Sequence, residues 1–162
     1  MSPNNLRNSK GLLIDTNLLI LLAIGALNPN QISRHKRTEK YTAEDYQLLV
    51  SFISRFGLVF TTPNILTEAS NLLGNYAYQD QQALALLKGI AEKMPEIFYE
   101  SLPTMQTYAK SYLKFGSTDA TIHLVATENY LILTDDLRLC AYLQNQGLLA
   151  INFNNLRDYL LR

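Results

Sequence analysis

The stretch that decides the fold is LLIDTNLLILLAIGAL, from Leu12 to Leu27. It is apolar except near its start, where Asp15 and Asn17 interrupt it. An ionised carboxylate is costly to bury, so we expect Asp15 to end a strand, cap the following helix or hold a cation. The unbroken apolar part, Leu18–Leu27, is only 10 residues long, which is too short to span a bilayer. We therefore expect a cytoplasmic chain without a membrane segment rather than one that starts with a signal peptide.

The bulk composition indicates one globular domain. The chain has 162 residues, of which 48% are hydrophobic and 17% charged, and its formal net charge is zero. A neutral chain has no global attraction for nucleic acid or membrane, so a polyanionic partner needs a local patch or a metal. The single cysteine, Cys140, excludes an internal disulfide and suits a reducing compartment. We expect a flexible N-terminus over residues 1–10 and one domain over residues 11–162.

Short apolar runs alternate with helical patterns along this domain. Four runs read as buried strands, and a fifth is a weaker candidate: Gly11–Asp15, Gly57–Thr62, Asn129–Asp136, Leu148–Phe153 and, as the weaker one, Glu96–Ser101. Apolar residues between the runs recur at helical spacing. This alternation predicts an α/β fold with a largely parallel sheet. A polar, turn-rich insertion over residues 28–45 is the one departure from compactness.

Acidic residues fall where this fold would bring them together. Asp15 and the pair Asp135–Asp136 each end a strand candidate, and ligands of open α/β sheets bind beyond the carboxyl ends of the strands. Glu68 shares a helix face with Ile65 and Leu72, and Asp119 lies in the first turn of a later helix. Taken singly, Asp15, Asp119 and Asp136 could be helix-capping or dipole-facing residues. Glu68 could lie at the edge of its stripe and reach water, but a core-facing glutamate has no capping explanation.

Four converging carboxylates would repel one another, at about 4 kcal/mol for each pair 4 Å apart in a medium of dielectric constant near 20. Such a cluster is reasonable if cations occupy it or if some acids stay protonated. Oxygen ligands without a nearby set of cysteines and histidines favour Mg²⁺ or Mn²⁺ over zinc. Metal-assisted cleavage of phosphodiesters is the chemistry that fits.

Four segments, in order, resemble the acid motifs of PIN-domain ribonucleases of the single-domain, VapC-like type: LLIDTNLLI, TTPNILTEASNLL, STDATIHLVA and LILTDDLRL. The resemblance implies a three-layer α/β/α fold with about five parallel strands and an Mg²⁺ or Mn²⁺ site. It implies that Asp15, Glu68, Asp119 and Asp136 are the catalytic and metal-binding residues. By the same resemblance Asn17 and Thr134 support the site, and Asp135 occupies a variable position.

The resemblance also implies an RNA substrate, and it raises the possibilities of an antitoxin partner and a homodimer. Local basic residues could bind RNA phosphates: Arg34, Lys36, Arg37 and Lys40. A short run of charges is more often a solvated loop. The alternative function is a non-catalytic PIN-like module that binds RNA or protein. A haloacid-dehalogenase-type phosphatase fits less well, because it needs an acid two residues after Asp15, where this chain has Asn17.

Overall fold

The computed structural model describes residues 9–74 and 78–160, with side chains described for 9–74 and 81–158. It is an α/β structure built on one four-stranded, all-parallel sheet with the strand order β2-β1-β3-β4. The strands are β1 (Leu12–Ile14), β2 (Val59–Phe60), β3 (Leu131–Thr134) and β4 (Ala150–Asn152). The α/β class and the parallel sheet are thus confirmed. The expected flexible N-terminus falls mostly on residues 1–8, which lie outside the described part.

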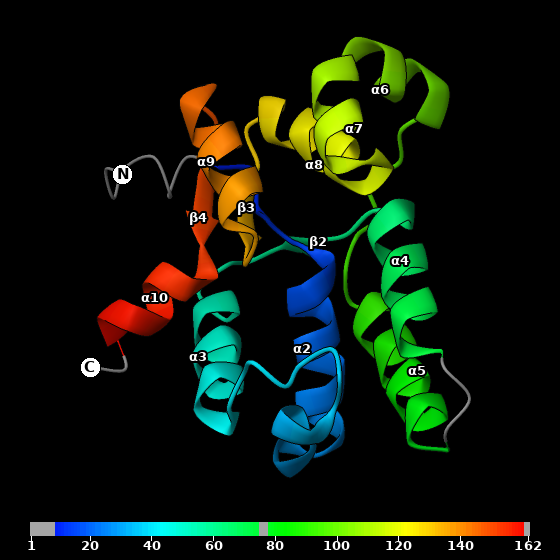
Figure 1. Cartoon of the computed structure of the whole chain (residues 1–162), viewed down its shortest axis with the longest axis vertical. Helices are drawn as coiled ribbons and strands as arrows, with labels where there is room; N and C mark the ends of the chain where they lie inside the picture. The colour runs from blue at the N-terminus through cyan, green and yellow to red at the C-terminus, as the bar shows by residue number, and fades with distance from the viewer. Residues whose placement is uncertain (1–8, 75–77, 161–162) are drawn as a thin grey trace.

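Helices connect the strands and lie on both sides of the sheet. They are α2 (Thr16–Leu27), η1 (Pro29–Arg34), α3 (Ala43–Ile53), α4 (Pro63–Leu73), α5 (Tyr78–Ala91), α6 (Ser101–Thr107), α7 (Ala109–Phe115), α8 (Ser117–Thr127), α9 (Leu137–Asn145) and α10 (Phe153–Leu160). Figure 1 shows α2 to α5 on one side of the strands and α6 to α9 on the other. This arrangement is compatible with a three-layer fold.

The sheet has fewer strands than the sequence predicted. Within the described residues, the run Glu96–Ser101 forms no strand, and only an isolated parallel bridge joins Glu96 to Thr61. The backbone of Thr61 accepts a hydrogen bond from Ile97 N at 2.9 Å and donates one to Pro95 O at 3.2 Å. The chain turns into α6 at Ser101, so this segment lies beside the edge of the sheet without extending it by a full strand.

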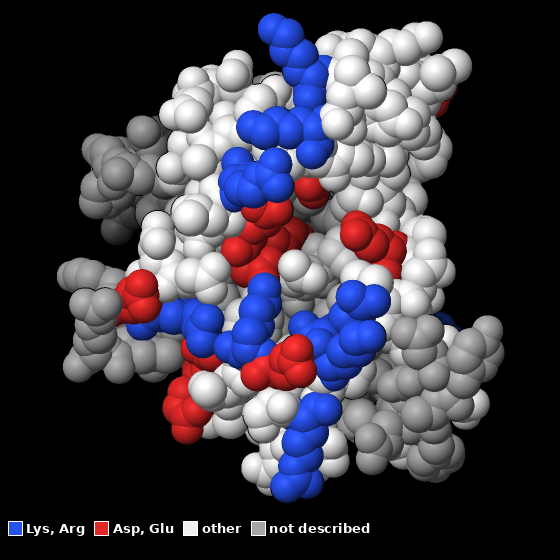
Figure 2. Space-filling view, viewed as in Figure 1, with Lys and Arg blue, Asp and Glu red and all other residues white. Residues whose placement is uncertain are grey.

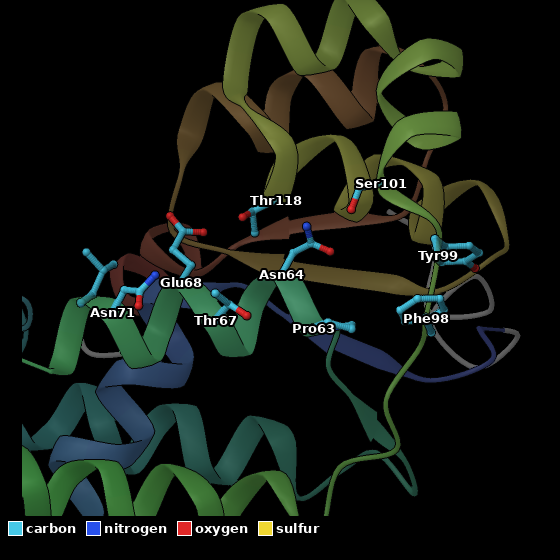
Figure 3. A pocket seen from close by; sticks show the side chains of 10 residues that line it. Pro63, Asn64, Thr67, Glu68, Asn71, Phe98, Tyr99, Ser101 and Thr118 are labelled. Carbon is cyan, nitrogen blue, oxygen red and sulfur yellow. The ribbon is translucent and has the colours of Figure 1, made fainter.

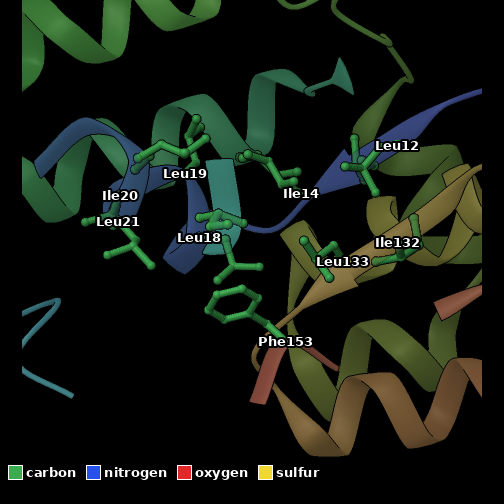
Figure 4. Packing of buried hydrophobic residues seen from close by; sticks show 14 of the residues in the cluster. Leu12, Ile14, Leu18, Leu19, Ile20, Leu21, Ile132, Leu133 and Phe153 are labelled. Atoms are coloured by element: carbon green, nitrogen blue, oxygen red, sulfur yellow. The ribbon is translucent and has the colours of Figure 1, made fainter. Parts of the chain in front are cut away.

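Helix α2 forms the centre of the core. Eight consecutive residues, Leu18–Gly25, are buried, because β1 feeds this helix directly under the sheet and other helices pack around it. Figure 4 shows side chains of α2 beside those of β1 and β3, with Phe153 closing the cluster. Within the described residues, no helix is both long and apolar enough to cross a membrane.

The insertion over residues 28–45 is packed against the rest of the domain. It contains η1 and the start of α3, which Thr42 caps through a reciprocal pair of hydrogen bonds with Asp45. Ile32, Thr38 and Tyr41 are buried. Arg157 from α10 holds the segment, donating to Asp45 Oδ1 at 2.6 Å. The segment is therefore a structured part of the domain rather than a solvated loop.

Candidate functional site

The carboxyl ends of β1 and β3 place Asp15 and Thr134 side by side. The register pairs Ile14 with Leu133, so the next residue of each strand reaches the same edge of the sheet. The Thr134 hydroxyl donates a hydrogen bond to Asp15 Oδ2, and the amide of Asp135 donates to the same oxygen at 3.0 Å. Asp15 Oδ1 accepts from Leu18 N at 3.0 Å and so caps α2. The strand-end and helix-cap interpretations of Asp15 are both confirmed.

Asp135 lies directly behind this edge and is enclosed by polar partners. Its side chain is 1% exposed. Asn17 Nδ2 donates to Oδ1 at 2.9 Å, while the Lys40 ammonium and the Tyr41 hydroxyl both donate to Oδ2. The insertion thus supplies two of the three side chains that satisfy this buried carboxylate. Asn17, expected to support Asp15, contacts Asp135 instead.

Asp15 and Asp135, which we call the inner pair, have pKa values that are shifted in opposite directions. Burial, followed by the charge of Asp135, raises the pKa of Asp15 well above its usual value. Burial alone would also raise the pKa of Asp135, but hydrogen bonds from Lys40, Tyr41 and Asn17 hold it below its usual value. Asp135 therefore carries the negative charge of the inner pair, and Asp15 is the member that a cation would have to deprotonate.

Three further acids, which we call the outer acids, lie around this edge: Glu68, Asp119 and Asp136. Asp136 is exposed and caps α9, because its Oδ1 accepts from Arg138 N at 2.7 Å and Leu139 N at 3.0 Å. Its capping role, one of the alternatives predicted from the sequence, is confirmed.

Glu68 is half-buried on α4 and extends toward α2. Its Oε2 accepts a hydrogen bond from the Thr16 hydroxyl at 3.0 Å. Thr16 follows Asp15 immediately, so Glu68 reaches the beginning of the same helix that Asp15 caps. The face of α4 that carries Glu68 also carries the buried Ile65, as the helical spacing predicted.

Asp119 is the most perturbed of the outer acids. Burial, then the charges of Asp136 and Glu68, raise its pKa from 3.8 to about 7. Its carboxylate has no hydrogen-bond partner among residues 9–74 and 78–160, unlike Asp15, Asp136 and Glu68. Since two acidic neighbours act on Asp119 from α4 and α9, the three outer acids share one electrostatic environment.

The donor chemistry of these acids fits a hard divalent cation. Such ions take oxygen ligands, and no positive group of the described residues offsets the acidic neighbours of Asp119. However, no three carboxylate, histidine or cysteine side chains of the described residues are grouped closely enough to hold a metal ion. The charges therefore favour a cation, whereas a complete ligand set would require the outer acids to move together.

A cleft of about 400 Å³ adjoins the outer acids along α4. We call it the α4 cleft, and its lining residues are Pro63, Asn64, Thr67, Glu68, Asn71, Leu72, Phe98, Tyr99, Ser101 and Thr118. Figure 3 shows Glu68 toward one end of this row and Phe98 and Tyr99 toward the other. The same glutamate thus belongs to the outer acids and to the cleft wall.

Basic side chains flank the acidic surface. Figure 2 shows Asp and Glu side chains gathered near the middle of one face, with Lys and Arg side chains above and below them. Arg34, Lys36 and Arg37 are exposed. Lys40 is exposed as well, but its ammonium is paired with the buried carboxylate of Asp135.

Several site residues were not predicted from the sequence. Tyr41 binds Asp135 and Thr16 binds Glu68, and no local pattern marks either contact. Phe98 and Tyr99 line the α4 cleft, and their only sequence signal was a pair of adjacent aromatic residues in a weak strand candidate. No protein-family model matches the chain, and neither does any curated protein.

Proposed function

We propose that the chain is an Mg²⁺- or Mn²⁺-dependent endoribonuclease that hydrolyses RNA phosphodiester bonds, with Asp15, Glu68, Asp119 and Asp136 as its acids. The observation that carries this proposal is the environment of Asp119. Its pKa is raised by burial first and then by the charges of Asp136, which caps α9, and of Glu68, which lies on α4. Acids placed so as to destabilise one another are typical of functional sites. The four motifs that resemble PIN-domain ribonucleases supply these same residues.

A divalent cation bound by these acids would lower the pKa of a water molecule and neutralise charge on the phosphodiester. The chain's own residues prepare the site for it. The Thr134 hydroxyl and the Asp135 amide orient Asp15, and the Thr16 hydroxyl orients Glu68. Asp119 gives up its proton most readily when a cation offsets its two acidic neighbours, so metal binding and proton release are coupled.

RNA is the substrate that we propose, and Arg34, Lys36 and Arg37 are the phosphate-binding candidates. All three are exposed, and the resemblance is to ribonucleases. Lys40 is a weaker candidate, because binding a phosphate would take its ammonium away from Asp135. The toxin role, the antitoxin partner and the homodimer rest on the family resemblance alone.

The direct test is cleavage of single-stranded RNA by the purified chain with Mn²⁺ or Mg²⁺ and with EDTA. We expect metal-dependent cleavage that Asp119→Asn and Glu68→Gln each reduce at least about 100-fold, the scale on which removing one charge-stabilising group acts in enzymes. Asp158→Asn, an exposed acid on α10, is the control and should cleave like the wild type. If the wild type leaves the RNA intact in Mn²⁺, and Asp15→Asn changes no measured property of the protein, the nuclease proposal is wrong.

The alternative function is a non-catalytic module that binds RNA or protein. One observation favours it: within the described residues, no three candidate ligands are grouped closely enough for a metal ion. Binding of RNA without cleavage, unchanged by Asp119→Asn, would support this alternative.

A further inference from the structure

We infer that the α4 cleft binds an unpaired nucleobase of the RNA strand whose backbone lies at the outer acids. This inference rests on the proposed function, because it identifies the substrate as single-stranded next to the scissile bond. The cleft volume of about 400 Å³ lies within the range of small-molecule sites.

The charges in the cleft exclude a phosphate and favour a neutral ligand. None of the described residues that line it is basic, and Glu68 is the one acid among them. A phosphate would therefore meet a negative charge without a compensating cation, whereas a nucleobase carries no charge. Bases also present both donors and acceptors along their edges, which matches a wall of amides and hydroxyls.

The polar wall is built by one face of α4. Asn64, Thr67, Glu68 and Asn71 follow the spacing i, i+3, i+4 and i+7, so their side chains lie in a row. Asn71 has no hydrogen-bond partner among the residues that the structure describes. Asn64 has only two contacts at 3.4 Å, to Ser117 and Thr121. Within the described residues, the Asn71 amide is thus unpaired and the Asn64 amide has only long contacts that a base edge could replace.

Aromatic rings stand at the other end of the cleft. Phe98 is 72% exposed, an unusual exposure for a large apolar side chain. The ring of Tyr99 is anchored through a hydrogen bond between its hydroxyl and Glu128, which, after burial, contributes to a raised pKa of Tyr99. Exposed aromatic rings provide stacking surfaces for unpaired bases. Glu68 lines the opposite end of the cleft and is itself one of the outer acids, so a strand with a base on Phe98 could run along the cleft with its backbone leading toward the acids.

The experiment uses a single-stranded RNA hexamer that carries the fluorescent base 2-aminopurine. Binding is measured by anisotropy, and stacking by quenching, in EDTA and again in Ca²⁺. We expect the wild type to quench the probe. Phe98→Ala should weaken binding by about 5- to 20-fold and remove the quenching, since one base–aromatic stack contributes on this scale. Phe98→Tyr, which keeps a ring, should restore both.

The matched control is Leu102→Ala, which removes another exposed apolar side chain, 65% exposed on α6 and outside the cleft lining. It should bind and quench like the wild type. The same RNA as a duplex should bind without quenching. The inference is overturned if the wild type does not bind or quench the hexamer, or if Phe98→Ala behaves like the wild type.

The two proposals can fail separately in this design. If the wild type quenches the probe through Phe98 but does not cleave RNA in Mn²⁺, the cleft inference stands and the nuclease proposal falls. If Asp119→Asn abolishes cleavage while Phe98→Ala leaves binding, quenching and KM unchanged, only the cleft inference falls.

Discussion

Replacing Asp119 with asparagine should stabilise the metal-free protein at pH 8. Burial and then the charges of Asp136 and Glu68 destabilise the ionised form of this carboxyl group and raise its pKa from 3.8 to about 7. A group with a raised pKa in the folded state binds its proton more tightly there than in the unfolded chain. Its stabilising contribution is full below about pH 4 and is lost as the pH rises through about 7. Asparagine is neutral at every pH and does not suffer this loss.

The size of the effect follows from the shift. A pKa change from 3.8 to about 7 corresponds to about 4 kcal/mol of the free energy of unfolding at high pH. Asparagine recovers less than this, because it stays half-buried and loses an interaction with the α8 dipole of about 0.3–1 kcal/mol. We expect a net gain of about 1–3 kcal/mol at pH 8, which is roughly 3–10 °C in Tm for a domain of this size.

The assay is urea or thermal unfolding of the wild type and Asp119→Asn at pH 4.5 and pH 8 in EDTA. The gain should be present at pH 8 and absent or reversed at pH 4.5, because most of the loss in the wild type occurs between these two pH values. Asp158→Asn removes an exposed acid. It should change the free energy of unfolding by less than about 0.5 kcal/mol at either pH. Equal or lower stability of Asp119→Asn at pH 8 would refute the idea that the outer acids repel one another.

A second arm of the same assay concerns the cation. Mn²⁺ should raise the Tm of the wild type at pH 8, because any ligand that binds only the folded state stabilises it. The increase should be smaller for Asp119→Asn, which lacks one of the proposed ligands. An equal increase in both proteins would remove Asp119 from the metal site while leaving the repulsion argument intact.

Two further predictions concern stability. Lys40→Met should destabilise the protein by about 1–3 kcal/mol at pH 7, because it leaves the buried charge of Asp135 with fewer partners. Since the pKa of Asp135 is lowered, this loss should shrink as the pH falls below the normal pKa of an aspartate. Urea unfolding at pH 3 and pH 7 measures it, and an equal loss at both would contradict the role of the ion pair. Gly25→Ala should lower the free energy of unfolding by about 1–3 kcal/mol, because its Cβ would lie 2.2 Å from the ring of Tyr46. Gly89→Ala, whose Cβ would meet nothing within 4 Å, should leave thermal stability equal or slightly higher. Similar Tm values for the two variants would contradict the close packing of α2 against α3.

The sheet could be predicted from the sequence to the extent that its strands are buried on both faces. Such strands read as continuous apolar runs, and β1, β3 and β4 all lie within predicted runs. The run Glu96–Ser101 is apolar only over its three middle residues, and within the described residues it forms a single isolated bridge to Thr61. A short edge segment has few neighbours to pack against, so composition alone does not decide whether it pairs.

The positions of the acids could be predicted from the sequence in part, but the partners of Asp135 could not. Asp15 and the pair Asp135–Asp136 follow strands, and the local rule that parallel strands end at one edge of the sheet was enough to bring Asp15 and Asp135 together. The partners of Asp135 could not be predicted, because Lys40 lies 95 residues away in the chain and sits in a segment whose charges resemble those of a solvated loop. The burial of Tyr41 and the hydrogen bonds from Arg157 to that segment are among the contacts that fix it in place.

This contact changes the meaning of the insertion over residues 28–45. Lys40 and Tyr41 fix the negative charge on Asp135, and that charge, after burial, raises the pKa of Asp15. The amide of Asp135 meanwhile holds the Asp15 carboxylate in place. The insertion therefore acts on the proposed metal ligand through the Asp135 side chain, by fixing the charge that, after burial, makes Asp15 harder to deprotonate. A loop that served only to bind RNA phosphates would not need a lysine whose ammonium contacts a buried carboxylate. Of the four basic residues, Lys40 therefore stabilises Asp135, while Arg34, Lys36 and Arg37 remain exposed for a phosphate.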